Sequence, residues 1–179
     1  MRVVAGELGG RLFEAPPGLD TRPTTDKVRE AVFNALGSLD LVRDAAVADL
    51  FAGSGALGIE ALSRGAAHCT FVERDRRALR TIRENLRQLD LADRSRVVAG
   101  DAAVLVGGLD VDIVFVDPPY EFDAWPELLR STRAPFVVAE AGRSLDRVDG
   151  VAELDAWEIT RTKRYGRTWV TFLERTGNT

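Results

Sequence analysis

Apolar and polar positions alternate along most of this chain in two different periods. From Ala46 onward, apolar stretches of strand length are separated by segments with helical spacing. The clearest helix covers about residues 75–89, where apolar side chains recur three and four residues apart from Leu79 to Leu89. This alternation predicts an α/β fold, a parallel sheet with helices on both faces. The predicted strands lie near residues 46–51, 69–73, 95–99, 111–116, 135–140, 153–162 and 168–174.

The last two predicted strands are connected differently from the others. Only a few residues around Gly166 join them, too few for a crossover helix. We therefore expect an antiparallel hairpin at the C-terminal edge of a seven-stranded mixed sheet.

The first 45 residues have another pattern. Short apolar runs on both sides of a glycine-containing turn predict a small β-hairpin within residues 1–15, and Pro16-Pro17-Gly18 interrupts the chain after it. A helix is expected at about residues 25–37, where apolar residues are spaced as on one helix face. Residues 1–45 should form an extension on a catalytic core at 46–179, within a single domain of residues 1–179.

Composition narrows the class of protein. A chain of 179 residues with 45% hydrophobic side chains can bury the core of one domain. No apolar run has the length of a signal peptide or a membrane span, so we expect a cytoplasmic protein. The single cysteine, Cys69, and the single histidine, His68, leave no cluster with zinc-site spacing. We expect no metal site, and a buried structural thiol at Cys69.

A glycine-rich segment from Asp49 to Gly58 connects the first predicted strand to a helix. Gly53, Gly55 and Gly58 have the spacing of a dinucleotide-binding loop, in which the backbone comes close to a ligand. Glu73, at the end of the next strand, can accept hydrogen bonds from both hydroxyls of a ribose. A nicotinamide dinucleotide and S-adenosylmethionine fit this pattern equally well, because the helix N-terminus attracts either pyrophosphate or carboxylate.

Asp117-Pro118-Pro119-Tyr120 follows directly after the apolar run at 111–116. An exocyclic amine of a nucleobase is a poor nucleophile because it shares its lone pair with the ring. The Asp117 carboxylate and the Pro118 carbonyl can polarise its N–H groups, while Tyr120 stacks on the base and the prolines keep the loop rigid. Since ligands of such sheets bind beyond the carboxyl ends of the strands, this loop should lie beside the glycine loop. A methyl donor is therefore favoured over a hydride donor.

Basic residues are unevenly placed, although the net charge is −4. Residues 161–167 carry four positive charges, no negative charge and one tyrosine, a composition typical of a phosphate-contacting stripe. The alternative is a solvated strand edge whose charges prevent edge-to-edge pairing. A further group of arginines falls on or just before the predicted helix at 75–89, where we expect a solvated face: Arg74, Arg76, Arg77, Arg80, Arg83 and Arg87.

Four segments together resemble a known family: residues 22–30, 49–58, 60–66 and 117–120. Over nearly its whole length the chain resembles the RsmD family of bacterial class I methyltransferases. Asp-Pro-Pro-Tyr also occurs in adenine-N6 and cytosine-N4 methyltransferases, so residues 22–30 narrow the choice. The resemblance implies a Rossmann-like, S-adenosylmethionine-dependent enzyme. It also implies methylation of the N2 amine of a guanine in 16S ribosomal RNA, free or within an assembling 30S particle, by a monomeric protein.

The candidate site residues form three groups. Asp117, Pro118, Pro119 and Tyr120 are the expected catalytic residues. Asp101, after the third strand, is expected to bind the adenine of the donor or to cap a helix. The full set expected to bind S-adenosylmethionine is Asp49, Phe51, Ala52, Gly53, Ser54, Gly55, Gly58, Glu73, Arg74, Asp101, Ala102 and Asp117. The residues expected to contact RNA are Arg11, Arg22, Thr24, Arg29, Lys163, Arg164 and Arg167.

Other functions stay open at this point. A recessed loop demands an unpaired or flipped base, so a paired guanine is a poor substrate. The amine acceptor can instead be adenine N6 or cytosine N4 of DNA, or a protein glutamine. A non-catalytic ribosome-assembly factor is a further alternative, and a nicotinamide oxidoreductase is a more distant one.

Overall fold

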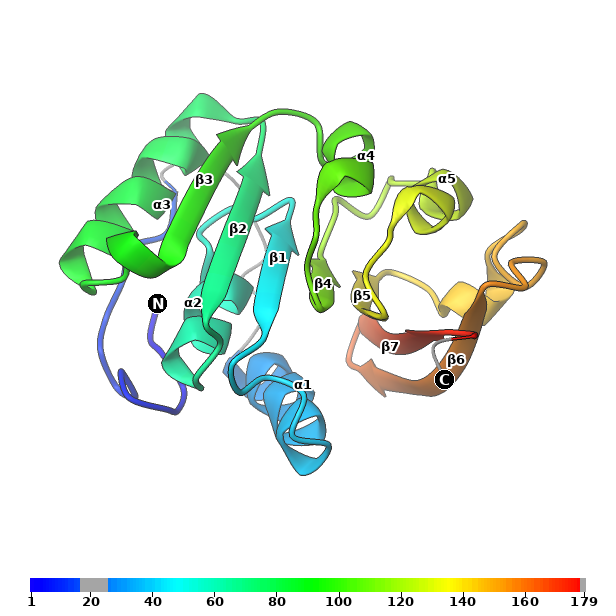
Figure 1. The fold of residues 1–179 in the computed structure, drawn as a ribbon, viewed down its shortest axis with the longest axis horizontal. Coiled ribbons are helices and arrows are strands. Elements are labelled where there is room, and N and C mark those ends of the chain that lie inside the picture. Colours follow the sequence, from blue (N-terminus) through cyan, green and yellow to red (C-terminus); the bar gives the residue numbers. More distant parts are fainter. Residues whose placement is uncertain (17–25, 178–179) are drawn as a thin grey trace.

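The computed structural model describes residues 1–16 and 26–177, and their strands form a seven-stranded sheet (Figure 1). The strand order is β3-β2-β1-β4-β5-β7-β6. Strands β1 to β5 are parallel, whereas β7 is antiparallel to both β5 and β6. The predicted mixed sheet with an antiparallel C-terminal hairpin at its edge is thus confirmed. The strands are β1 (Ala46–Leu50), β2 (His68–Glu73), β3 (Ser95–Ala99), β4 (Ile113–Val116), β5 (Phe136–Ala141), β6 (Trp157–Tyr165) and β7 (Thr168–Arg175).

Helices cover both faces of the sheet and bury two apolar cores (Figure 1). Helices α1 (Asp26–Ser38), α2 (Ala56–Ser63) and α3 (Arg76–Gln88) pack on one face. Helices α4 (Ala102–Leu105) and α5 (Trp125–Ser131) pack on the other. Short 3-10 turns η1 (Ala92–Arg94), η2 (Val106–Gly108) and η3 (Leu145–Arg147) complete the connections.

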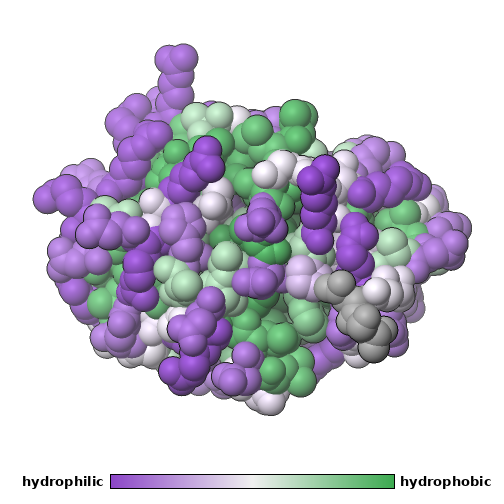
Figure 2. Space-filling view, in the orientation of Figure 1, coloured by the Kyte–Doolittle hydropathy of each residue, from purple (hydrophilic) through white to green (hydrophobic). Residues whose placement is uncertain are grey.

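Helix α3 forms where its apolar spacing predicts it. The Asp75 carboxylate caps the helix by accepting hydrogen bonds from the backbone N–H groups of Arg77 (2.8 Å) and Ala78 (2.9 Å). The hydrogen bond from Ala78 also lowers the pKa of Asp75. The arginines of α3 are exposed, and hydrophilic side chains gather over this helix in Figure 2, so the predicted solvated face is confirmed.

Two strands differ from their predicted bounds. β4 begins at Ile113, two residues after the predicted start, and the Asp112 carboxylate before it accepts a hydrogen bond from the backbone N–H of Ala46 (2.8 Å). β6 covers 157–165 instead of 153–162. The preceding apolar residues Val151 and Leu154 lie in turns and pack into the core beneath β6 and β7.

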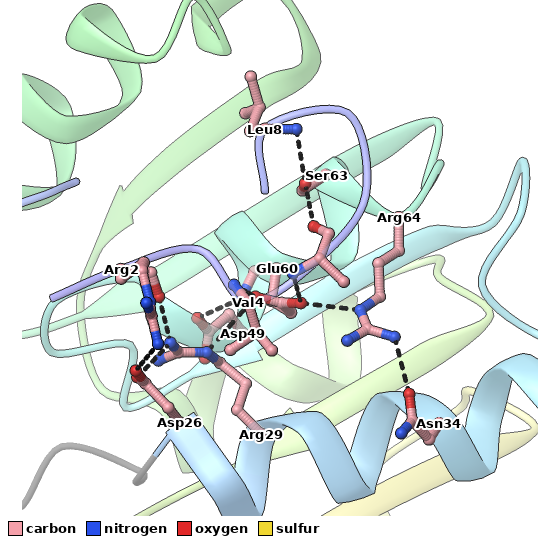
Figure 3. Close-up of polar contacts among 12 residues, drawn as sticks. Arg2, Val4, Leu8, Asp26, Arg29, Asn34, Asp49, Glu60, Ser63 and Arg64 are labelled. Atoms are coloured by element: carbon pink, nitrogen blue, oxygen red, sulfur yellow. Dashed lines mark hydrogen bonds and ion pairs between the residues drawn. The ribbon is translucent and has the colours of Figure 1, made fainter. Parts of the chain in front are cut away.

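The N-terminal segment, residues 1–16, forms the predicted small hairpin: Arg2 and Leu12 make an antiparallel bridge, and backbone hydrogen bonds join Met1 to Phe13 and Val3 to Arg11. Its backbone also bonds to side chains of α2. The Glu60 carboxylate accepts hydrogen bonds from the N–H groups of Val4 (2.8 Å) and Ala5 (3.1 Å) (Figure 3). Ser63 Oγ donates to the Ala5 carbonyl (2.6 Å) and accepts from the Leu8 N–H (3.0 Å).

Glu60 is also the centre of a buried charge network that attaches α1 (Figure 3). Its side chain is fully buried and pairs with Arg29 of α1 (3.5 Å) and with Arg64 (2.8 Å). Arg29 donates further hydrogen bonds to the Arg2 carbonyl and to Asp26 (2.9 Å). The network therefore joins α1, α2 and the N-terminal segment.

Candidate active site

A pocket of about 540 Å³ lies at the carboxyl ends of β1, β2 and β4. The chain leaves β1 toward β2 on one side and leaves β4 toward β5 on the other, so this is the point where the strand order reverses. Ligands of open α/β sheets bind at such a point. The pocket is lined by Met1, Ala15, Asp49, Phe51, Ala52, Gly53, Ser54, Ala56, Leu57, Val72, Glu73, Arg74, Asp75, Gly100, Ala102, Asp117, Pro118, Pro119, Tyr120 and Glu121.

The glycine loop turns sharply between β1 and α2. Phe51, Gly53 and Gly55 have positive φ values of 57°, 55° and 80°, so the turn uses backbone conformations that most side chains avoid. Gly58 packs so closely on β2 that a Cβ atom there would lie 2.3 Å from the Phe71 ring. Gly55 and Gly58, two of the predicted donor contacts, do not line the pocket; they shape the loop that does.

Most N–H groups of this loop already have protein partners. A pyrophosphate at a helix N-terminus is held by free backbone N–H groups. Four such groups are used within the protein: Ala52 donates to the Val72 carbonyl (3.1 Å), Gly53 to Glu73 (2.9 Å), Gly55 to the Ala52 carbonyl (2.6 Å) and Gly58 to Asp49 (2.9 Å). These four groups are thus used whether the anion is a dinucleotide pyrophosphate or the carboxylate of S-adenosylmethionine, so the choice of donor depends on the charges of the pocket.

The charges around the pocket favour a cationic ligand. Among the described residues the lining has one basic side chain, Arg74, and five acidic ones: Asp49, Glu73, Asp75, Asp117 and Glu121. S-adenosylmethionine carries a positive sulfonium and an ammonium group, whereas a nicotinamide dinucleotide carries negative phosphates. The pocket thus fits the methyl donor better.

Glu73 is held in place by the backbone around it. One carboxylate oxygen accepts from the Gly53 N–H, and the other accepts from the N–H groups of Arg74 (2.7 Å) and Asp75 (2.8 Å). These three bonds fix the side chain at the end of β2, where the one remaining lone pair can accept from the ribose.

Asp49 is a buried carboxyl group inside the acidic cluster. Desolvation raises its pKa well above the ordinary value, and the hydrogen bond from the Gly58 N–H offsets part of that rise. The negative charges of Asp117 and Glu73 raise the pKa further. A bound cation would lower it, so this cluster is built to respond to ligand charge.

The Asp-Pro-Pro-Tyr loop lies beside the glycine loop, as the order of the strands predicts, and all four of its residues line the pocket. The Tyr120 side chain is 40% exposed. Its ring packs over Gly142, and its hydroxyl lies 3.4 Å from Thr168 Oγ1 in β7. The loop therefore connects the pocket to the β6–β7 hairpin.

Asp101, the residue predicted to bind adenine, follows β3. Its neighbours line the pocket: Ala102, a predicted donor contact, and Gly100, which was not predicted. The Asp101 carboxylate accepts a hydrogen bond from the Ala103 N–H (2.9 Å) and caps α4, and Asp101 does not line the pocket. The capping role that the sequence left open is thus present.

The predicted RNA contacts divide into several groups. Lys163, Arg164 and Arg167 are exposed on the hairpin, beside the end of β7 that contacts Tyr120. Arg11 is exposed but donates to the Gln88 carbonyl (2.8 Å) at the far end of α3, about 18 Å along that helix from its first turn. Arg22 and Thr24 lie outside the described residues.

Arg29 was wrongly predicted to contact RNA. Its side chain is 0% exposed and is committed to Glu60, Asp26 and the Arg2 carbonyl, so no phosphate can reach it.

Two residues near the site were missed by the sequence analysis. Arg143 is exposed and follows Gly142, over which the Tyr120 ring packs. Asn85 is fully buried in α3 and bonds to the glycine loop. Neither residue lies in a recognisable sequence motif. Their places near the site become apparent only in the folded structure, where Gly142 lies under the Tyr120 ring and Ser54 accepts a hydrogen bond from Asn85.

Some general features bear on the function. No group of three or more potential metal-ligating side chains occurs within residues 1–16 and 26–177. In the same part of the chain, no helix is both long and apolar enough to cross a bilayer. Cys69 is buried, and burial raises the pKa of its thiol well above the ordinary value, as expected for a structural cysteine.

Comparisons with known proteins agree with the geometry. A protein of Bacillus subtilis (strain 168) named "Putative rRNA methyltransferase YlbH" is 40% identical over 99% of this chain and 100% of its own length. Ribosomal RNA small subunit methyltransferase D of Escherichia coli (strain K12) is 44% identical over 67% of this chain and 60% of its own length.

A solved structure shares the same fold. The structure titled "Putative methyltransferase yhhF from Escherichia coli" superposes with a TM-score of 0.83 at 35% identity, over 98% of this chain and 97% of that chain. The family model described as conserved hypothetical protein 95 matches residues 1–174. With its class I methyltransferase fold, the chain therefore belongs to this family, the RsmD family.

Proposed function

We propose that this protein transfers a methyl group from S-adenosylmethionine to the exocyclic N2 amine of an unpaired guanine in 16S ribosomal RNA. One observation carries the proposal: the acidic pocket with its glycine loop and the Asp-Pro-Pro-Tyr loop form one continuous site. The names of the two relatives support ribosomal RNA as the substrate. Such a substrate is cytoplasmic, free or in an assembling 30S particle.

The proposed donor contacts follow from the pocket. Glu73 accepts from the ribose, Gly100 and Ala102 border the adenine, and Asp49 and Asp117 face the positive charge. When bound, S-adenosylmethionine supplies an electrophilic methyl group on a sulfonium. Since all of these residues come from one chain, a monomer is sufficient.

The proposed role of Asp117 is to make the guanine amine reactive. Its carboxylate and the Pro118 carbonyl accept from the two N–H bonds of the amine, and the carboxylate stabilises the positive charge that develops on nitrogen. The amine proton becomes acidic as that charge develops, so a strong base is unnecessary. Pro118 and Pro119 restrict the loop, which keeps both acceptors aimed at one point.

Tyr120 is proposed to receive the target base by stacking. Its half-exposed ring is anchored by Gly142 and Thr168, so it presents a stable surface next to Asp117. Stacking requires an unpaired base, which restricts the substrate to an RNA loop or a flipped nucleotide. Arg143, Lys163, Arg164 and Arg167, here named the basic rim, are proposed to bind the flanking phosphates.

The proposed function is tested by replacing Asp117. We expect Asp117→Ala to lower the single-turnover methylation rate at least about 100-fold, because a preorganised acceptor is lost. Donor affinity, measured by calorimetry, should fall far less than the rate, because Asp49 and Glu73 still line the donor pocket. Asp123→Ala is the matched control, since Asp123 is an exposed carboxylate of the same loop outside the pocket lining. Equal rates for wild type and Asp117→Ala would refute the assignment.

A further inference from the structure

Asn85 is a buried polar residue that the proposed reaction does not use directly. It lies in α3 with 0% of its surface exposed. Its side-chain oxygen accepts from the Glu14 N–H (2.8 Å), and its amide nitrogen donates to the Glu14 carbonyl (2.9 Å) and to the Ser54 carbonyl (3.1 Å). One side chain thus joins three segments that are distant in sequence.

Both partners of Asn85 belong to walls of the pocket. Ser54 is in the glycine loop and lines the pocket, and Glu14 directly precedes Ala15, which lines the same pocket. We propose that Asn85 is a positioning residue for the methyl donor, holding the N-terminal segment against the glycine loop so that Ala15 and Ser54 enclose one cavity. This inference rests on the proposed function, in which that cavity binds S-adenosylmethionine.

The chemistry of the site suits an amide and no other common side chain. Two carbonyl oxygens and one N–H group face Asn85, and an asparagine amide has two N–H donors and one carbonyl acceptor. Aspartate has the same shape but would turn two hydrogen bonds into contacts between a carboxylate and two carbonyl oxygens. A buried site makes that reversal costly because water cannot compensate.

The glycine loop depends on such outside support. Its N–H groups at Ala52, Gly53 and Gly55 are satisfied by β2, Glu73 and its own turn, but the Ser54 carbonyl points toward α3. Losing the Asn85 amide would free this carbonyl and the Glu14 backbone together, although Glu60 and Ser63 still hold residues 4–8. The donor would then have to order both when it binds, so its affinity should fall while the chemical step is preserved.

The decisive variants are Asn85→Asp and Asn85→Ala, with Ser63→Ala as the matched control. Ser63 also holds the N-terminal segment, by two hydrogen bonds, but it does not reach the glycine loop. Calorimetry with S-adenosylmethionine and S-adenosylhomocysteine, thermal unfolding and steady-state kinetics are measured on all four full-length proteins, wild type included.

We expect both Asn85 variants to raise the donor Kd and KM at least tenfold, with kcat at saturating donor within threefold of wild type. Ser63→Ala should keep the donor Kd within twofold while its unfolding temperature falls. Donor affinities of the Asn85 variants equal to that of Ser63→Ala would overturn the positioning role. A wild-type protein that binds no donor would instead refute the proposed function, so the two failures are distinct.

Discussion

At the scale of single residues, the pocket is defined by where carboxylates are placed and how each is held. Glu73 has three backbone donors and Asp49 has one, whereas Asp117 stands on a rigid proline loop. Like charges so close together are tolerated when a cation joins them or when one of them takes up a proton. Burial is the main cause of the raised pKa of Asp49, and the neighbouring charges of Asp117 and Glu73 add to it. The same cluster of negative charges suits the proposed cationic donor.

Asp49 leads to a prediction about pH. Its folded pKa is raised above the unfolded value, so the native state binds more protons between the two values and stability falls as pH rises through that window. Asp49→Asn imitates the protonated form and lacks this loss. Relative to wild type, the variant should therefore gain stability as pH increases from about 4. Urea unfolding at several pH values measures the difference, and a difference that is constant with pH would contradict the prediction.

The residues that the sequence predicted well are those with a local signature. Glycine spacing, a glutamate at the end of a strand and two consecutive prolines mark these positions locally, and the structure places them in or beside the pocket, whereas their roles stay proposals. The prediction that Arg29 contacts RNA was wrong because an arginine on an amphipathic helix is normally exposed. The burial of Arg29 depends on Glu60, which is distant in sequence. Asn85 was missed for the same reason, since both of its partners come from other segments.

At the scale of elements, α2 is the helix on which the others depend. All of its residues are buried, because the sheet covers one side and the N-terminal segment and α1 cover the other. Glu60 and Ser63 accept hydrogen bonds from N–H groups of the N-terminal hairpin at Val4, Ala5 and Leu8. The extension is therefore built onto α2, and α2 begins at the glycine loop.

The Arg29–Glu60 pair makes this dependence measurable. Arg29→Met should destabilise the protein by about 3 kcal/mol, because it leaves a buried carboxylate with fewer partners. Arg29→Met combined with Glu60→Gln should be more stable than Arg29→Met alone, since the unpaired charge is removed. Urea denaturation gives both values. A cost below about 0.5 kcal/mol for Arg29→Met would mean that the residue behaves like a surface side chain.

The types and order of the helices and strands were predictable because the regular spacing of apolar residues along each segment determines them. The bounds of β6 were not, since Val151 and Leu154 have the apolar character of strand residues but pack from turns. The N-terminal hairpin was predictable, since its turn and apolar positions are local, and its backbone pairs Met1 with Phe13 and Val3 with Arg11. For β6, tertiary contacts decided the local structure.

At the scale of the whole molecule, positive charge is distributed unequally around an acidic pocket. The basic rim lies near the β6–β7 hairpin, at one edge of the sheet. The α3 arginines lie near the other edge, which β3 forms. The net charge of −4 therefore conceals a surface suited to phosphates next to Tyr120.

The salt dependence of RNA binding separates these two surfaces. Changing the four residues of the basic rim to glutamine should lower the slope of log K against log salt by about 2 to 3, since each lost phosphate contact removes about 0.7 for single strands. The control makes the same change in charge on α3, at Arg77, Arg80, Arg83 and Arg87. Its slope should equal that of wild type. Identical slopes for both variants would identify the rim as ordinary surface charge.

The central claim is methyl transfer to a guanine amine of small-subunit RNA under control of Asp117. Its most direct test supplies labelled S-adenosylmethionine with 16S RNA, 30S particles, DNA and protein separately, using RNA from a strain that lacks this gene. Digestion to nucleosides and mass spectrometry identify the product. We predict N2-methylguanosine from an RNA substrate with wild type and none with Asp117→Ala. Label in adenine, cytosine or protein, or equal yields from the two proteins, would contradict the account.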